Sequence, residues 1–169
     1  MIIFERLQDG SSAGINTHES DYFQHIWKVL PRYVTIPLKD ICDPFARDCV
    51  LAYPYTNDID KNTSAVTNLD AVEFLQEVQE YPDAIKFDLC IFDPPFSGRQ
   101  SDEKYDGHIN VYTDPGYVKK CMIEVGKILK PGGYLLKFGY NSSRHLKCLE
   151  LVKMWVVNFG GNRNDVIVT

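Results

Sequence analysis

Residues 87–96 read FDLCIFDPPF, an apolar run of strand length that ends in an acid and two prolines. A largely apolar run bounded by turn residues is typical of a strand that is buried on both faces. Such strands occur in parallel sheets that are covered by helices on both sides. The stretch therefore predicts a central parallel strand with Asp93 at its exit.

Strand and helix signals alternate on either side of this stretch. We expect helices over residues 20–30, 71–78, 115–129 and 143–151, and strands over residues 38–42, 49–57, 134–138, 152–159 and 165–169. Glycines and asparagines join the last two strands, which predicts a hairpin and an antiparallel final strand. Residues 1–20 are expected to form an N-terminal arm. The alternation predicts one α/β domain over residues 1–169 with a mainly parallel sheet.

Acidic residues follow four of the predicted strand segments. Asp43, Asp58 and Asp93 follow three strands, and Asp70 follows the short segment 66–69. Open parallel sheets bind ligands beyond the carboxyl ends of their strands, so we expect these carboxylates to share one edge. Asp58 and Asp70 are placed to accept hydrogen bonds from ribose hydroxyls and from an adenine amino group. Alternatively, Asp58 and Asp70 only cap helices and Asp43 only starts a proline turn, while Asp60 is expected to cap a helix over 62–66.

The tetrapeptide Asp93-Pro94-Pro95-Phe96 carries the most specific chemical signal. Its prolines fix the backbone and remove two N–H donors, so the carbonyl groups can only accept hydrogen bonds. A carboxylate and a rigid carbonyl could together hold both N–H groups of an exocyclic amine and free its lone pair for attack. The ring of Phe96 could stack on a flipped base. The alternative is a turn without a chemical role.

These motifs resemble those of the amino-group DNA methyltransferases, which modify N6 of adenine or N4 of cytosine. Asp93-Pro94-Pro95-Phe96 is similar to their catalytic motif, and Asp43-Pro44-Phe45-Ala46 is similar to the start of their cofactor loop. Lys130-Pro131-Gly132-Gly133 is similar to the turn before their fifth strand. The chain most resembles short phage and prophage adenine methyltransferases over residues 40–169, including the segment Gly160-Gly161-Asn162-Arg163-Asn164-Asp165.

The resemblance implies a Rossmann-like class I methyltransferase fold, with a mostly parallel seven-stranded sheet and an antiparallel C-terminal hairpin strand. It implies S-adenosylmethionine as cofactor, with Asp43, Phe45, Ala46, Asp58, Asp70 and Asp93 as cofactor-binding residues. It implies catalysis by Asp93, Pro94, Pro95 and Phe96 on the N6 amino group of adenine in DNA. Methylation of RNA, or a methyltransferase-like subunit without activity, are the alternatives.

Two departures from the family pattern bear on function. The cofactor loop of most members continues with glycines, which let the backbone approach a ligand closely, whereas here it continues with Arg47-Asp48-Cys49. The chain also has no separate target-recognition domain. We therefore expect target contacts from the polar stretch 97–114, especially from Arg99, Gln100 and Tyr105, or from another subunit. That stretch could instead be a solvated connection.

Composition and charge limit the partners. Hydrophobic residues make up 44% and charged residues 24%, as in ordinary globular proteins, and no apolar run approaches the roughly 18–20 residues that span a bilayer. No signal peptide is recognisable and the five cysteines show no metal spacing, so we expect core thiols and a cytoplasmic location, in the host cell if a phage encodes the chain. The net charge of −5 is unusual for a protein that grips DNA unaided. A basic patch, a second copy or a partner subunit is expected to help.

Overall fold

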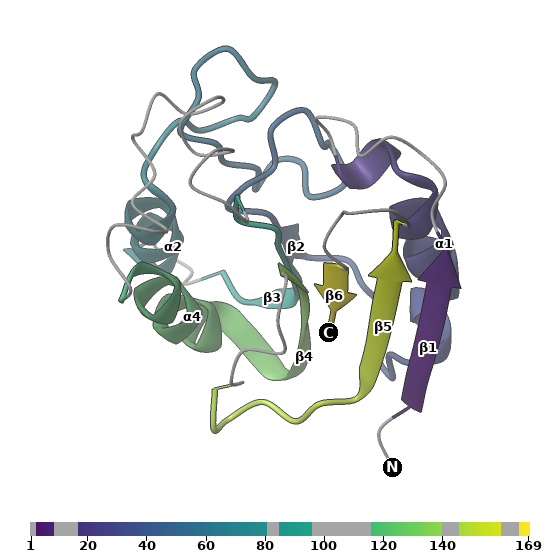
Figure 1. The fold of residues 1–169 in the computed structure, drawn as a ribbon. Coiled ribbons are helices and arrows are strands. Elements are labelled where there is room, and N and C mark those ends of the chain that lie inside the picture. Colours follow the sequence, from purple (N-terminus) through teal and green to yellow (C-terminus); the bar gives the residue numbers. More distant parts are fainter. Residues whose placement is uncertain (1–2, 9–16, 81–84, 96–115, 140–145, 160–165) are drawn as a thin grey trace.

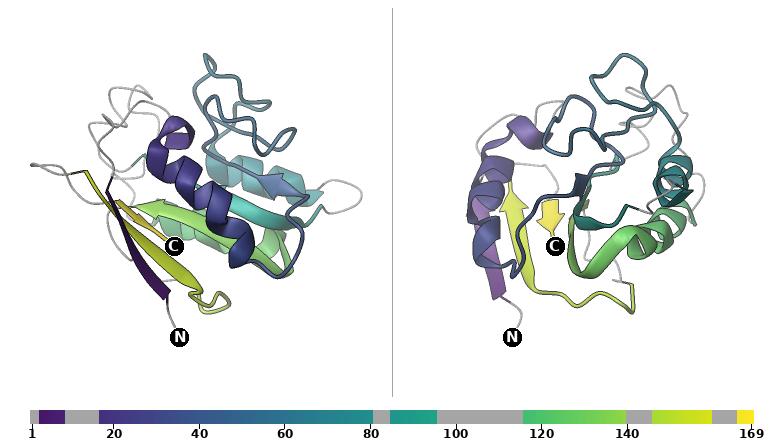
Figure 2. Two further views of the ribbon diagram at one scale, coloured as in Figure 1. Left: turned by 90° about the vertical axis from the view of Figure 1, so that its right-hand side faces the viewer. Right: turned by 180° about the vertical axis from the view of Figure 1, so that it is seen from behind.

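The computed structural model describes residues 3–8, 17–80, 85–95, 116–139, 146–159 and 166–169, and these residues form a sheet with helices on both faces (Figures 1 and 2). The strands are β1 (Ile3–Gln8), β2 (Ile41–Cys42), β3 (Phe87–Phe92), β4 (Leu129–Gly139), β5 (Lys153–Asn158) and β6 (Val166–Val168). The helices are α1 (Asp21–Val29), α2 (Ala71–Glu80), α4 (Tyr117–Ile128) and two short 3-10 helices, η1 (Thr17–Glu19) and η2 (Leu30–Arg32). In this part of the chain no helix is long and apolar enough to cross a membrane.

The six strands lie in the order β1-β5-β6-β4-β3-β2. β2, β3 and β4 pair in parallel, β1 pairs in parallel with β5, and β6 is antiparallel to both of its neighbours. The predicted α/β class and the antiparallel final strand are confirmed. The strands expected over 49–57 and 66–69 are reduced to two isolated parallel bridges, Asp43↔Thr56 and Asn57↔Thr67. Pro54 lies just before these residues and cannot donate to a ladder, which limits strand formation there.

The N-terminal arm expected over residues 1–20 is wrong for its first part, because Ile3–Gln8 forms an edge strand (Figure 1). Every residue of β1 pairs with β5, from Ile3↔Lys153 to Gln8↔Asn158. The side chain of Glu5 accepts from Lys153 Nζ (2.9 Å) and Trp155 Nε1 (3.2 Å), which holds this register. The segment pairs with the open edge of β5. The local pattern of residues 3–8 gives no sign of this partner strand.

Each face of the sheet carries its own hydrophobic core, and β3 contributes to both. Cys90 and Phe92 belong to the core under α2 and α4, whereas Leu89 and Ile91 belong to the core under α1. All six residues of β3 are buried, as the sequence predicts for a central strand. The five cysteines are free thiols, and four of them are buried. The expected core thiols are therefore found, except that Cys148 is exposed.

Two further predictions near the sheet need correction. Residues 146–151 form a turn followed by irregular chain, not the last turns of a helix over 143–151, whose first residues lie outside the described part. β4 begins at Leu129 rather than at Tyr134, but its pairing with β3 shifts between Phe87↔Leu129 and Leu89↔Tyr134. The expected turn lies in this irregularity, where Gly132 has φ 78°. A Cβ on Gly133 would lie 2.9 Å from the Lys130 carbonyl oxygen, so the close approach requires glycine.

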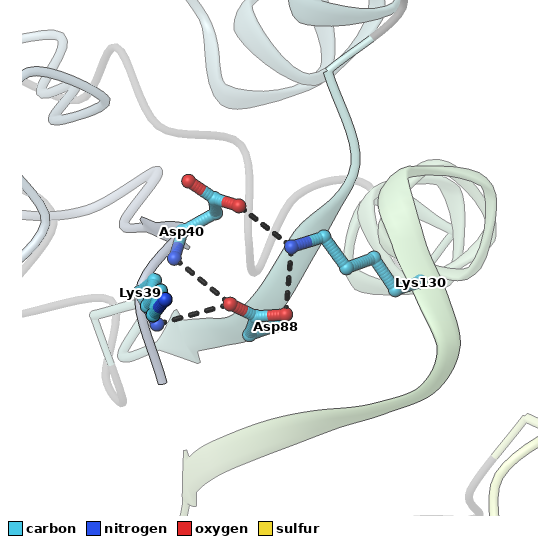
Figure 3. A network of polar contacts seen from close by, with 4 residues as sticks. All are labelled: Lys39, Asp40, Asp88 and Lys130. Carbon is cyan, nitrogen blue, oxygen red and sulfur yellow. Dashed lines mark hydrogen bonds and ion pairs between the residues drawn. The ribbon is translucent and has the colours of Figure 1, made fainter. Parts of the chain in front are cut away.

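A polar network joins the amino ends of β2, β3 and β4 (Figure 3). The Asp88 carboxylate accepts from the N–H groups of Lys39 (2.9 Å) and Asp40 (3.0 Å) and from Lys130 Nζ (2.8 Å). Lys130 Nζ also donates to Asp40 (2.6 Å). The network sets the start of β2, and the parallel pairing then brings Asp43 and Asp93 out at the same edge of the sheet.

We expect the Asp88 network to make the fold sensitive to acid. Burial acts against the charge of Asp88, but the N–H groups of Asp40 and Lys39 and the Lys130 ammonium outweigh it and lower its pKa to about 2. A depressed pKa stabilises the fold above the unfolded value near 4, and this contribution disappears as the pH falls from about 4 to about 2. Urea unfolding at several pH values should show Asp88→Asn to be less stable than wild type by about 1–2 kcal/mol at pH 6, after allowing for solvent screening. A difference that persists unchanged at pH 2 would contradict this role.

Candidate functional site

Three acidic residues meet at the carboxyl edge of the sheet. Asp43 follows β2, Asp93 follows β3, and Asp58 follows the bridge at Asn57 that continues the ladder. Asp43 and Asp58 are 3% and 1% exposed, and Asp93 is partly exposed. Burial raises the pKa of Asp43 well above its usual value, and the charges of Asp93 and Asp58 raise it further against a hydrogen bond from Phe45. Asp43 therefore lies close enough to Asp58 and to Asp93 for the charge of each to act on its carboxyl group.

The loop after β2 makes a turn of the kind that glycine favours, although it contains no glycine. Arg47 has φ 47°, in the left-handed region, which costs an L-residue roughly 1–2 kcal/mol. Two hydrogen bonds hold the turn: Ala46 N–H donates to the Asn57 carbonyl oxygen (2.8 Å), and Arg47 N–H donates to Asp58 Oδ2 (3.1 Å). The missing glycines therefore do not prevent a tight turn at this position.

Phe45 and Ala46 were predicted as cofactor-binding residues, and both side chains are buried. The ring of Phe45 packs edge-on against Phe92, with ring centroids 5.3 Å apart. Phe45 thus belongs to the core under α2 and α4. These two residues could contact a ligand only through their main-chain atoms.

The side chain of Asp58 accepts main-chain hydrogen bonds from the loop after β2 and from the turn that follows Asp58 itself. Oδ2 accepts from Arg47 N–H (3.1 Å), and Oδ1 accepts from Asp60 N–H (2.9 Å). Burial raises the pKa of Asp58, against these hydrogen bonds and the Arg47 charge. Each carboxylate oxygen has a second lone pair, so ribose hydroxyls can still be accepted. Residues 61–64 form a turn rather than a helix, so Asp60, which accepts from Asn62 N–H (2.9 Å), caps that turn instead of the expected helix.

Asp70 performs the capping role that was weighed as the alternative. Its Oδ1 accepts from Val72 N–H (2.8 Å) and its carbonyl oxygen accepts from Phe74 N–H (2.9 Å), at the start of α2. Its Oδ2 accepts from the hydroxyl group of Tyr117, the first residue of α4 (2.7 Å). Asp70 therefore ties α2 to α4, and its role toward an adenine stays a prediction.

Asn57 is a central residue of the site that the sequence did not reveal. Its side chain is fully buried, and its Nδ2 donates to the carbonyl groups of Pro44 (3.2 Å) and Leu69 (3.0 Å). Its Oδ1 accepts from Thr67 Oγ1 and from Leu69 N–H, both at 2.9 Å. One amide thus joins the loops that carry Asp43 and Asp70. In the sequence, the only signal is an amide at the end of a predicted strand.

Asp93 follows β3 directly and brings the proline pair to the candidate site. Pro94 and Pro95 directly after it are buried, which leaves residues 93–95 little freedom to move. Burial raises the pKa of Asp93 to about 7, and a side-chain hydrogen bond with Thr17 opposes this shift. Phe96, Arg99, Gln100 and Tyr105, predicted to contact a base or a nucleic-acid strand, lie outside the described residues.

A cavity of about 320 Å³ lies away from the acidic edge, beside the amino ends of β4 and β5. Tyr33, Tyr134, Lys153 and Trp155 are among the residues that line it. Lys153 is paired with Glu5 (2.9 Å), and the Tyr134 hydroxyl group bonds to the main chain and side chain of Thr35. Lys153 and Tyr134 are thus engaged with the protein, and the acidic edge remains the better candidate.

Comparison with known proteins does not extend this description. The chain matches no protein-family model, no curated protein sequence and no solved structure.

Proposed function

We propose that this chain transfers a methyl group from S-adenosylmethionine to the N6 amino group of adenine in DNA. The observation that carries the proposal is the meeting of Asp43, Asp58 and Asp93 at one sheet edge, with two buried prolines directly behind Asp93. Carboxyl groups that repel one another in a buried position are characteristic of functional sites, because the fold alone gains nothing from placing them together.

The arrangement of the sheet supports a class I methyltransferase fold. If the two bridged segments at Thr56–Asn57 and at Thr67 are taken as short strands, they and β2 to β6 make a seven-membered sheet with an antiparallel C-terminal strand. β1 would then be an addition at the far edge. Sheets of this kind bind their ligands at the carboxyl ends of the strands, where the acids gather.

The residues at this edge fit S-adenosylmethionine by their chemistry. The cofactor has hydroxyl, amino and ammonium donors and a positive sulfonium, and the edge offers buried acceptors whose pKa values are raised by burial and, at Asp43, by mutual repulsion. A positively charged ligand with many donors would relieve that repulsion. Asp58 would hold the ribose, Asp43 and the main chain of residues 45–47 would line the loop, and Asp70 would have to share its carboxylate with Tyr117. When bound, the cofactor supplies an activated methyl group.

The chemical work of the chain is to hold the target amine. The Asp93 carboxylate and the Pro94 carbonyl oxygen would accept its two N–H groups, which frees the nitrogen lone pair from the base. The prolines keep these acceptors fixed, so little reorganisation is needed when the amine arrives. The target base would be flipped out of the duplex to reach this point, with Phe96 stacking on it. Alignment of the nitrogen with the methyl donor is then a positioning effect.

The acidic charge bears on how the substrate is bound. With a net charge of −5 the chain has little general attraction for DNA. We therefore include a second copy or a partner subunit in the proposal, with Arg99, Gln100 and Tyr105 as local contacts to the strand. A cytoplasmic location, in the host cell if a phage encodes the chain, goes with this activity.

Calorimetry with S-adenosylmethionine and its demethylated product tests the proposal first. We expect binding with a Kd between about 1 µM and 1 mM, the usual range for enzyme ligands. Incubation with methyl-labelled cofactor and separate pools of unmethylated DNA and RNA should then label the DNA at N6 of adenine. Label in the RNA pool alone would show that the substrate is RNA and not DNA. If neither ligand binds, the result favours the alternative, a methyltransferase-like subunit without activity.

A further inference from the structure

Asp70 is held at a fixed place relative to Asp58 by hydrogen bonds of the segments that precede both residues. Asp58 N–H donates to the carbonyl oxygen of Thr67 (3.1 Å). The side chain of Asn57 bonds to both the N–H group (2.9 Å) and the carbonyl oxygen (3.0 Å) of Leu69, the residue before Asp70. The two acids therefore keep a constant spacing, as the joined ribose and adenine of one ligand would require.

The carboxylate of Asp70 has a different donor on each oxygen. Oδ1 accepts from Val72 N–H (2.8 Å), and Oδ2 accepts from the hydroxyl group of Tyr117 (2.7 Å). A carboxylate turns readily about its last bond when one oxygen is held, and a second donor restricts that rotation. The cap of α2 needs only the bond from Val72, so capping does not account for the bond from Tyr117.

Tyr117 is a donor in a fixed position. It is the first residue of α4, and its buried ring packs in the core that α2 and α4 share where the two helices lie together (Figure 1). Burial raises the pKa of its hydroxyl group, and the neighbouring Cys121 and the hydrogen bond to Asp70 raise it further, so the group keeps its proton. Asp70 is only partly buried, which leaves it within reach of a ligand.

We propose that Tyr117 is a positioning residue for Asp70, whose carboxylate it orients to accept from the 6-amino group of a bound adenosyl ligand. This inference rests on the function proposed above. An ionised carboxylate has about four acceptor positions, so the bonds from Val72 and Tyr117 leave about one on each oxygen. The amino group of adenine is a donor, whereas a 6-oxo purine places an oxygen there and leaves the carboxylate unpaired. Tyr117 thereby increases the preference of the site for adenine over other purines.

The test measures this preference in Tyr117→Phe, which loses the hydroxyl group and keeps the buried ring. The two ligands are S-adenosylhomocysteine and S-inosylhomocysteine, in which an oxygen replaces the 6-amino group. Calorimetry, with ligand-detected NMR for weak binding, should show that wild type prefers the adenosyl ligand by about 100-fold. Tyr117→Phe should bind the adenosyl ligand about ten-fold more weakly and the inosyl ligand as wild type does.

A double variant and a matched control show whether Tyr117 acts through Asp70. In Asp70→Asn the carboxylate is absent, so adding Tyr117→Phe should not change the preference further. Tyr134→Phe also removes a hydrogen-bonded hydroxyl group, which contacts Thr35 N–H (2.9 Å), but it lies at the cavity beside the amino ends of β4 and β5. This control should keep the wild-type preference.

Three results for Tyr117→Phe would overturn the inference. Equal weakening of both ligands would mean that the hydroxyl group only supports the fold, and tighter binding of the adenosyl ligand would mean that it competes with adenine. The third is wild-type affinity for both ligands. Methylation by wild type tests the proposed function separately from all three. If wild type discriminates between the ligands but methylates no nucleic acid, methyl transfer fails and the role of Tyr117 at an adenosyl site stands. If wild type binds neither ligand, both proposals fail.

Discussion

Replacing Asp93 by alanine is expected to lower kcat for DNA methylation by about 10³-fold, while S-adenosylmethionine still binds. The amine loses the acceptor that draws it out of conjugation with the base, and Pro94 alone cannot hold both N–H groups. Asp93→Asn keeps the shape and one neutral acceptor oxygen, so we expect a smaller loss of roughly 10–100-fold. Single-turnover transfer of labelled methyl groups, combined with calorimetry of cofactor binding, measures both effects.

The free energy of unfolding of the Asp93 variants tests the same site in a second way. Asp93 and Asp43 repel each other, and burial raises the pKa of both carboxyl groups. Removal of the Asp93 carboxyl group should therefore leave the free energy of unfolding unchanged or increase it, as is usual for residues kept for function rather than for folding. Normal methylation by Asp93→Ala would remove the mechanism proposed here.

Asp58→Asn is expected to weaken S-adenosylmethionine binding by about 10–100-fold and to destabilise the fold by about 1–3 kcal/mol. Both carboxylate oxygens accept main-chain N–H groups, from Arg47 and from Asp60. An amide has only one acceptor oxygen, so its Nδ2 would face a buried N–H group and leave it unpaired. The loop that holds Arg47 in a left-handed conformation would loosen, and the ribose would lose a charged acceptor.

Asp60→Asn is the matched control for this variant. Asp60 uses only Oδ1 to accept from the main chain and side chain of Asn62, and an asparagine oxygen can do the same. Titration calorimetry and urea unfolding should find this control close to wild type in affinity and stability. Equal affinity and stability in Asp58→Asn and Asp60→Asn would show that Asp58 serves neither the loop nor the cofactor.

The strongest sequence predictions were those that depend on short-range patterns. The apolar run 87–92 forms a strand with the expected bounds, and the 3.6-residue periodicity located α1, α2 and α4 to within a few residues. The rule that parallel strands end at the same edge predicted four acids there, and three of them, Asp43, Asp58 and Asp93, follow the strands and bridge at that edge, whereas Asp70 caps α2. The helix predicted over residues 143–151 failed in its described part, because residues 146–151 form a turn and irregular chain although Leu146, Leu149 and Leu151 are apolar.

The placement of the individual acids could not be derived in the same way. Asp58 and Asp70 look equivalent in the sequence, since each follows a short strand segment. In the structure Asp58 is buried and holds the loop at Arg47, while Asp70 caps α2 and accepts from Tyr117. The difference arises from which segment packs over each carboxylate, and that depends on α4 and on the bridged segments around Asn57.

Hydrophobic periodicity, proline positions and the order of acids along the chain are properties of neighbouring residues, and they were sufficient to predict a mostly parallel α/β sheet with Asp93 at the carboxyl edge of its strands. The pairing of β1 with β5 and the hydrogen bonds of the Asn57 side chain could be seen only in the folded chain. Each of these joins segments that are separate in the sequence. Their stability comes from hydrogen bonds and packing formed only when the sheet has assembled, so no local pattern records them.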